Sequence, residues 1–594
     1  MPKQKSIWKP MGFLLRQMAK HPFLMSVVVL TLVLTTATNI IIPYLTKPII
    51  NDYILTHDLS GLVRMLFILG IVYLISLLVS YFNSRLLVRL SQRVTLSLRS
   101  EVFAKLQKLP MSYFDKKTHG ELMSTYTNDI DTISNFISGS VSSLAIGIPT
   151  FFGILAVMIV MNPLLTLVSG VFLFAQYMMM KKSGGISRKY FVKQQKDLAN
   201  INGFIEEMTE GQKVIKVFGY ENTAVERFNQ RNDELLKSSY SAQLYSGIIN
   251  PALGGIAEIN NAITCSVGVV MAIFGTFDVG SLVAFILYVQ KAGAQIGVLS
   301  GMVNMVLAAV AGTERVMFIL DQKDEVDEGT VVQRETGNDL RWQGTQVDKP
   351  LRGEIRLEKV CFGYKDGQTV LKDISLVAGP GHKIAFVGST GAGKTTITNL
   401  LNRFYEISSG RITYDDIDLC DIKKDDLRMT LSMVLQDTHL FTDTVRENIR
   451  FGRLEATDAE VENAAQLAGA HFFIEHLPNG YDTVLTADGN NLSQGQRQLL
   501  SIARAACANP SVLVLDEATS SIDTRTEKLI EEGMNRLMEN RTVFIIAHRL
   551  STVRRCDSIL VLEHGEIIER GTHAELLEKQ GRYHSLYTGK EELG

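Results

Sequence analysis

The chain has 594 residues, of which 46% are hydrophobic and 21% are charged, and its net charge is −2. This composition excludes a disordered chain and a small disulfide scaffold, and the charge gives no sign of a nucleic-acid partner. Five scattered cysteines without metal-ligand spacing predict reduced thiols. The charge is unevenly divided, because residues 1–320 carry a net +10 and residues 321–594 a net −12. We therefore expect two chemically different parts.

The N-terminal segment Ser6–Lys20 predicts an amphipathic helix lying on the membrane surface. Its large apolar residues lie among basic ones: Trp8, Phe13, Leu14, Leu15 and Met18. A signal peptide is the alternative, since basic residues precede the first apolar run. That run exceeds the roughly 7–15 apolar residues of a signal peptide, and no convincing cleavage site follows it.

Six apolar runs predict six membrane-spanning helices, because a span needs about 20 mostly apolar residues. Residues 23–45, 65–82 and 132–180 are uncharged, and the last run divides at Met161-Asn162-Pro163. Residues 238–290 carry only Glu258 and Asp278 as charges, and residues 292–313 carry none. This stretch predicts two helices that turn near residues 275–280.

The basic residues predict the orientation of these spans. Residues 83–131 carry eight Lys or Arg and residues 181–237 carry eleven, whereas the connections on the other side of the membrane carry almost none. The positive-inside rule places both long connections and the N-terminus in the cytoplasm. Because apolar residues keep helical spacing in these connections, we expect the membrane helices to continue beyond the lipid.

A change in composition marks the end of the membrane part. Residues 321–350 are rich in Asp, Glu, Gln, Gly and Thr, which predicts a linker. We expect a six-helix α transmembrane domain over residues 1–320, a linker over 321–350 and an α/β domain over 351–594. In the last of these, short β-rich runs alternate with helical patterns, which is typical of a largely parallel sheet.

A phosphate-binding motif follows the apolar run 384–387. The motif is G-x-x-x-x-G-K-T, and a helical pattern follows it. Its glycines let successive N–H groups face phosphate oxygens, the lysine reaches the β- and γ-phosphates, and the threonine hydroxyl suits Mg²⁺. The candidate ATP-binding residues here are Gly388, Ser389, Thr390, Gly391, Ala392, Gly393, Lys394, Thr395 and Thr396.

Two further apolar runs end in polar residues. Residues 511–515 lead into Asp516 and Glu517, and residues 543–547 lead into His548. Parallel strands deliver such residues to the sheet edge beside the phosphate loop. Asp516 suits Mg²⁺ coordination, Glu517 is the candidate general base for an attacking water, and His548 could meet the γ-phosphate.

One motif makes a family resemblance specific. The segment 492–496 resembles the LSGGQ signature of ATP-binding cassette (ABC) ATPases, and it precedes the Asp516 strand as it does in that family. Its residues are Leu492, Ser493, Gln494, Gly495 and Gln496. The resemblance further implies that Tyr364 stacks on adenine, Gln436 forms the Q-loop and joins Thr395 and Asp516 at Mg²⁺, Asp523 belongs to the D-loop, and His548 is the switch histidine.

The complete chain resembles an ABC exporter half-transporter, in which six spans precede one ATPase domain. The family includes P-glycoprotein and bacterial multidrug and lipid exporters. Residues 113–121 followed by 127–131, and residues 211–221, are similar to the family's two coupling-helix regions. These segments would transmit closure of the ATPase domains to the membrane helices.

The resemblance implies a dimer, because Ser493 and Gly495 would contact the γ-phosphate of ATP held by a second half-transporter. Both halves of the composite site have their expected residues, which permits a homodimer. Gln494 replaces the usual glycine and resembles a variant of bacterial heterodimeric exporters. We therefore favour a heterodimer in which this chain carries the catalytic glutamate. Residues 488–491 also depart from the Gly-Glu-x-Gly pattern of the exporter X-loop.

Polar residues in the spans are candidates for the substrate pathway, since charges in lipid are costly. They are Glu258, Asn261, Gln290 and Gln295. Glu258 could equally lie near a helix end or bond internally. We expect ATP-driven export of hydrophobic or amphiphilic compounds across the cytoplasmic membrane, with ATP and Mg²⁺. A lipid or peptide exporter and, in another class, an ATP-gated channel or sensor are the alternatives.

Overall fold

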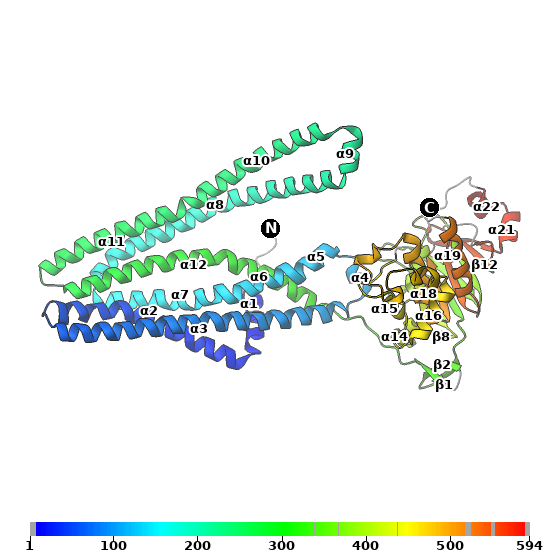
Figure 1. Ribbon diagram of the computed structural model, residues 1–594, viewed down its shortest axis with the longest axis horizontal. Coiled ribbons are helices and arrows are strands. Elements are labelled where there is room, and N and C mark those ends of the chain that lie inside the picture. The colour runs from blue at the N-terminus through cyan, green and yellow to red at the C-terminus, as the bar shows by residue number, and fades with distance from the viewer. Residues whose placement is uncertain are drawn as a thin grey trace. The chain divides into compact units, whose positions relative to one another are not determined.

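The computed structural model describes residues 7–336, 339–365, 367–435, 438–516, 524–547 and 553–588. The chain forms two compact units, one of Met1–Gln107 with His119–Gln322 and the other of Lys108–Thr118 with Lys323–Gly594. Figure 1 labels the elements of both.

The first unit is helical. In chain order its helices are α1 (Trp8–Ala19), α2 (Pro22–Pro48), α3 (Leu59–Leu106), α5 (His119–Ser124), α6 (Ile130–Asn135), α7 (Val141–Met161), α8 (Pro163–Glu210), α9 (Gln212–Phe218), α10 (Glu221–Gly247), α11 (Ile249–Ile273) and α12 (Val279–Leu320). The π-helical turns η1 (Ile49–Ile54), η2 (Thr125–Asp129) and η3 (Phe136–Ser140) follow α2, α5 and α6.

Six helical segments of the described residues are long and apolar enough to cross a membrane, as the sequence predicts. The expected break also lies where predicted, since α7 ends at Met161 and α8 begins at Pro163. Asn162 caps α8 by accepting a hydrogen bond from the Leu165 N–H at 3.0 Å. Proline suits the first helical position because its missing N–H would be unpaired there.

The predicted extension beyond the membrane is confirmed in helix length. Helices α3 and α8 have 48 residues each, which is about 70 Å of helix at 1.5 Å per residue. A membrane core is only about 30 Å thick. Helix α8 lies beside α10 and α11 along this length (Figure 1).

Buried polar side chains join the helices within the bundle. The Thr31 hydroxyl of α2 donates to the Asn83 side chain of α3 at 3.1 Å, and Asn83 donates to Ser142 of α7 at 2.9 Å. At the end of α12, the Arg315 guanidinium donates to both carboxylate oxygens of the buried Asp129 at 2.6 and 2.5 Å. Such contacts specify helix pairing where apolar surface alone does not.

Helix α1 has the predicted amphipathic character. Leu14 and Met18 are each 2% exposed, whereas Trp8 is 83% exposed. On the polar side, Lys20 forms an ion pair with Glu101 of α3 at 2.6 Å. The helix therefore buries one apolar face against the bundle, and its place at the membrane surface stays a prediction.

The second unit is an α/β structure with three sheets. Its strands are β1 (Val332–Thr336), β2 (Asp339–Gly344), β3 (Val347–Pro350), β4 (Ile355–Phe362), β5 (Leu371–Ala378), β6 (Lys383–Val387), β7 (Ser409–Tyr414), β8 (Ile417–Asp418), β9 (Leu431–Val434), β10 (Val512–Asp516), β11 (Thr542–Ile546), β12 (Ser558–Glu563) and β13 (Glu566–Gly571). The largest sheet has the order β13-β12-β6-β11-β10-β9 and is parallel except at β13. The largely parallel sheet predicted from the sequence is therefore confirmed.

Ten α-helices of the described residues belong to this unit. They are α4 (Met111–Phe114), α13 (Lys394–Leu401), α14 (Lys424–Thr430), α15 (Val445–Arg450), α16 (Asp458–Ala468), α17 (His471–Glu475), α18 (Gln494–Ala508), α19 (Thr524–Leu537), α21 (His573–Glu578) and α22 (Arg582–Tyr587). Strands β5-β4-β7-β8 form a second sheet and β1-β2-β3 a third, both antiparallel.

The third sheet corrects the expected linker. Residues 321–350 contain β1, β2 and β3, and Trp342 of β2 is fully buried. Its indole N–H donates to Asp415 at 2.9 Å, and its ring meets Tyr414 edge-on at 5.2 Å. A buried tryptophan thus helps to fix a polar segment to the core of the unit, which composition alone does not reveal.

The entry to this unit is held by an ionic cluster. The Glu325 carboxylate accepts hydrogen bonds from Arg428 at 2.6 and 3.1 Å and from Lys424 at 3.2 Å. Burial of the carboxylate opposes its ionisation, but these two cations outweigh it and hold the pKa of Glu325 below its usual value.

Candidate ATP site

The phosphate loop connects the buried strand β6 to helix α13. Glycine is required where the loop turns most tightly. Gly393 has φ +104°, and a Cβ there would lie 2.5 Å from Leu371 Cδ2. A Cβ on Gly388 would lie 2.2 Å from the carbonyl oxygen of Leu562. The curl that exposes backbone N–H groups to phosphate therefore depends on these two glycines.

The Lys394 ammonium lies inside this curl. Its Nζ donates to the carbonyl oxygens of Gly388 at 2.5 Å and Ser389 at 3.2 Å, and the residue is 6% exposed. Burial lowers the pKa of Lys394, and the charge of Asp516 opposes that shift. The lysine is held by neutral carbonyls and can exchange them for phosphate oxygens.

Asp516 ends β10 at the same sheet edge as the phosphate loop. It pairs in register with Ile546 of β11, which pairs with Phe386 of β6. The carboxyl ends of the three strands thus converge, as expected at a phosphate site. The Thr395 side chain is exposed beside Lys394. A hydroxyl and a carboxylate at one edge are oxygen donors that suit Mg²⁺.

Tyr364 lies beside the helix that follows the loop. Its hydroxyl donates to Thr396 Oγ1 at 3.2 Å. Its ring meets Phe362 and Tyr405 edge-on, both at 5.0 Å between centroids. Because the residue is 41% exposed, part of its ring is accessible to a planar base.

The signature segment forms the start of α18. Ser493 is the N-cap, and its hydroxyl accepts from the Gln496 N–H at 3.3 Å while the Gln496 side chain accepts from the Ser493 N–H at 2.9 Å. Ser493 and Gln494 are exposed, whereas Leu492 and Gly495 are buried. The segment therefore presents an exposed helix N-terminus, which attracts anions.

Arg504 of α18 and Asp488, which precedes that helix, both bind residues 439–440. Arg504 belongs to no sequence motif. The Arg504 guanidinium of α18 donates to the carbonyls of His439 at 3.0 Å and Asn448 at 2.9 Å, and burial lowers its pKa. Asp488, in the altered X-loop, accepts from the Leu440 N–H at 3.2 Å. That hydrogen bond, aided by His439, lowers the pKa of Asp488. The only sequence signal for Arg504 is an arginine in a helix otherwise rich in small and apolar residues.

Four predicted site residues lie outside the described part of the chain. They are Gln436, Glu517, Asp523 and His548. Three of them, Gln436, Glu517 and His548, follow strands of the parallel sheet in the sequence. These strands are β9, which ends at Val434, β10, which ends at Asp516, and β11, which ends at Ile546.

The predicted substrate-pathway residues lie on α11 and α12, and their role stays a prediction. Glu258 and Gln290 are exposed on α11 and α12, and Asn261 and Gln295 are partly buried. Among the hydrogen bonds between described residues, none joins these four side chains to one another. They remain separate candidates.

Lys291 is a charged residue within the apolar sequence of α12, between the stretches 238–290 and 292–313. Lys291 is twelve residues after the start of α12, about 18 Å along the helix and so near mid-membrane. Its ammonium donates to the backbone and side-chain oxygens of Asn39 at 2.9 and 3.4 Å. Pro43, inside α2, cannot donate to that backbone carbonyl. Lys291 therefore satisfies a carbonyl that proline leaves unpaired, and a lone lysine in an apolar span was the available signal.

Comparison with known proteins identifies the family. The family described as ABC transporter transmembrane region matches residues 25–291, and the family described as ABC transporter matches residues 371–520. The ABC transporter ATP-binding protein YfiC of Bacillus subtilis (strain 168) is 41% identical over 97% of this chain and 93% of its own. A fatty acid ABC transporter ATP-binding/permease protein of Mycobacterium tuberculosis (strain CDC 1551 / Oshkosh) is 40% identical over 89% and 82%.

A solved structure extends the similarity to the complete fold. The structure of a bacterial Atm1-family ABC exporter with ATP bound is similar with a TM-score of 0.77 and 26% identity, covering 96% of this chain and 98% of that chain. A Staphylococcus aureus (strain NCTC 8325 / PS 47) protein named for multidrug export is 33% identical over 92% of this chain and 93% of its own.

Proposed function

Because this chain belongs to the ABC transporter family, as an ATP-hydrolysing exporter with transmembrane and ATP-binding domains, we propose that it exports hydrophobic or amphiphilic compounds across the cytoplasmic membrane. The observation that carries the proposal is the joining of six candidate spans to a formed phosphate loop in one polypeptide. Relatives named for fatty acid transport and for multidrug export support the substrate class. The positive-inside pattern supports a cytoplasmic N-terminus and ATPase domain.

The phosphate loop would bind the ATP phosphates through its backbone N–H groups, residues 388–395. Lys394 would exchange the carbonyls of Gly388 and Ser389 for the β- and γ-phosphates, and Tyr364 would stack on adenine. These steps would need only small side-chain movements, because the loop is already curled and Tyr364 is 41% exposed.

Thr395, Gln436 and Asp516 would hold Mg²⁺, which neutralises charge on the phosphates. Glu517 would position and deprotonate the attacking water, and His548 would contact the γ-phosphate. A general base acts on rate more than on affinity.

A second half-transporter would complete each ATP site. Ser493 and Gly495 would contact ATP held by the partner, and the exposed N-terminus of α18 supports this. The short helix α9, in the predicted second coupling region, leaves Val214, Val217 and Phe218 61–78% exposed, which suits docking on another subunit. Gln494 favours a heterodimer.

The proposal is tested with the full chain in lipid vesicles whose ATPase domains face outward. Addition of MgATP should drive a fluorescent amphiphile into the vesicle lumen against its gradient. Glu517→Gln should bind ATP and stop both hydrolysis and accumulation. Downhill conductance without turnover would indicate a channel and refute the pump. A folded chain that binds ATP without turnover, measured with its oligomeric mass, would indicate a missing second subunit.

A further inference from the structure

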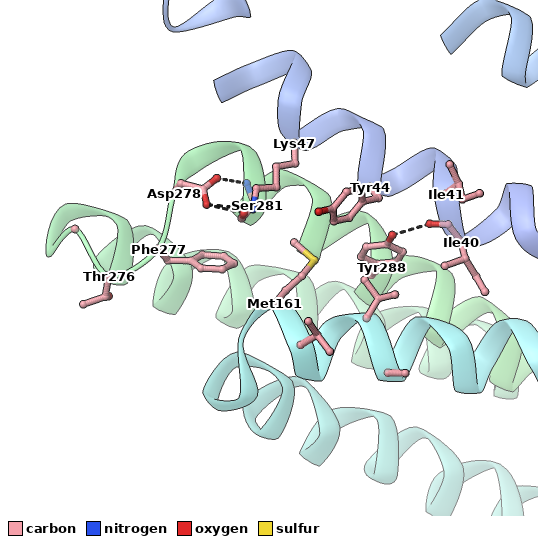
Figure 2. Close-up of a pocket in the computed structure, with 14 residues that line it drawn as sticks. Ile40, Ile41, Tyr44, Lys47, Met161, Thr276, Phe277, Asp278, Ser281 and Tyr288 are labelled. Atoms are coloured by element: carbon pink, nitrogen blue, oxygen red, sulfur yellow. Dashed lines mark hydrogen bonds and ion pairs between the residues drawn. The ribbon is translucent and has the colours of Figure 1, made fainter. Parts of the chain in front are cut away.

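A cavity of about 830 Å³ lies between α2, α7 and the turn from α11 to α12. Figure 2 shows its lining. Its walls are mostly aliphatic and aromatic, including Ile40, Val157, Met161 and Phe277. Pockets of roughly 300–1,000 Å³ hold one small ligand. The cavity therefore has the size and lining for one apolar chain.

One end of the cavity is charged. Lys47 and Asp278 lie there, and their closest nitrogen and oxygen atoms are 3.9 Å apart. They are the two charged side chains of the described lining. Figure 2 shows the Tyr44 hydroxyl turned toward the Lys47 side. The lining is thus amphiphilic along its length, with the charged groups at one end.

The Asp278 carboxylate is already satisfied by neutral donors. It accepts from the Ser281 N–H and the Ser281 hydroxyl, both at 2.6 Å, and from the Asn51 side chain. Burial opposes ionisation, but the Ser281 and Asn51 hydrogen bonds outweigh it and lower the pKa of Asp278. Asp278 caps α12, and the charge of Lys47 lowers this pKa less than those hydrogen bonds do.

Lys47, in contrast to Asp278, has few hydrogen-bond partners. Its contact with Asp278 is long, no described residue accepts a hydrogen bond from it, and its side chain is 38% exposed. An ammonium has three donors. Lys47 therefore has free hydrogen-bonding capacity at the mouth of an apolar cavity.

We propose that this cavity binds a single-chain amphiphile with an anionic headgroup, which places its carboxylate on Lys47 and its chain along the apolar walls. A cationic headgroup is disfavoured, because it would meet Lys47 and would have to compete for oxygens that Ser281 and Asn51 already occupy. Lys47 follows the uncharged run of residues 23–45, so the headgroup would lie at the membrane surface. The proposed orientation makes that surface the outer one and the cavity a release-side site, and this assignment rests on the proposed function.

The test uses the full chain in nanodiscs of zwitterionic lipid, without nucleotide. The probes are a diazirine analogue of palmitate, the matching analogue of hexadecanol, and dodecyltrimethylammonium as competitor. Binding is measured at pH 8.5, because desolvation raises a carboxyl pKa near lipid, and cross-linked peptides are identified by mass spectrometry.

Lys47→Gln should weaken palmitate binding about tenfold or more, as expected for a charge-assisted contact, and leave hexadecanol binding unchanged. Lys47→Arg should retain palmitate binding. Arg64→Gln is the matched control, since Arg64 is an exposed basic residue at the same end of the bundle and outside the cavity lining. Ala156→Phe, which fills the apolar part, should weaken both probes. Cross-links should fall in residues 156–161 or 275–281.

The proposal would be overturned if Lys47→Gln weakened both probes equally or left palmitate binding unchanged. It would also be overturned if the unsubstituted chain bound dodecyltrimethylammonium more tightly than palmitate. Export without Lys47-dependent palmitate binding would leave the proposed function standing and refute this site. Lys47-dependent palmitate binding in a chain that does not export would support this site and refute the proposed function.

Discussion

Replacement of Tyr364 by alanine is the sharpest test of the ATP site that the described residues allow. Stacking of a base on an aromatic side chain contributes about 1–3 kcal/mol. Tyr364 makes T-shaped ring contacts with Phe362 and Tyr405 and is 41% exposed, so adenine can reach its ring. We take about 2 kcal/mol, which weakens ATP binding about thirtyfold.

The conservative variant Tyr364→Phe keeps the stacking surface and loses the hydrogen bond to Thr396 at 3.2 Å. A neutral hydrogen bond contributes about 0.5–1.5 kcal/mol, and this one is partly exposed. We therefore expect about a threefold loss, so the two variants should differ by about tenfold.

The assay is displacement of a fluorescent ATP analogue from the full chain in nanodiscs, by ATP and separately by tripolyphosphate. Tripolyphosphate has no base, so Tyr364→Ala should leave its affinity unchanged. Equal loss of ATP and tripolyphosphate would mean that the substitution disturbs the phosphate loop. Unchanged ATP affinity would refute adenine stacking on Tyr364.

Three further predictions concern stability, each measured by thermal inactivation of the full chain in nanodiscs. Arg315→Met should cost about 2–3 kcal/mol because it strands a buried carboxylate, whereas Arg99→Met, in an exposed pair, should cost less than about 1 kcal/mol; equal effects would contradict the burial argument. Since the pKa of Glu325 is lowered on folding, the ionised carboxylate stabilises the fold above about pH 4.5, and this stabilisation is lost as the pH falls through the folded pKa. Glu325→Gln should remove that part of the acid sensitivity. An unchanged pH profile of stability in this variant would refute the prediction. Lys291→Met removes a charge whose burial in the membrane costs about 3 kcal/mol, but it leaves the Asn39 carbonyl unpaired at a cost of about 1–3 kcal/mol. Because the two effects nearly cancel, the midpoint of thermal inactivation should move by only about 2 °C. A large loss of stability would show that the ammonium itself stabilises the bundle.

Local patterns determined most of the architecture before any tertiary information. The uncharged runs predicted the six spans, because a helix in lipid must satisfy its own backbone. The residues Asn162 and Pro163 predicted the break between α7 and α8, because cap and proline chemistry act over one turn. The motif of residues 388–395 predicted a strand, a loop and a helix, since the glycines at 388 and 393 tolerate a backbone and close contacts that other residues do not.

Tertiary structure decided whatever depends on partners distant in the sequence. Trp342 can be buried in the sheet of residues 332–350 because Asp415, 73 residues away, accepts its N–H. Lys291 can lie in a membrane span because Pro43, in another helix, leaves the carbonyl of Asn39 unpaired. Lys47 retains free donors because Ser281 and Asn51 satisfy Asp278. In each case the free energy of a polar group depends on which partner the fold brings within hydrogen-bonding distance, and composition and periodicity carry no record of that distance.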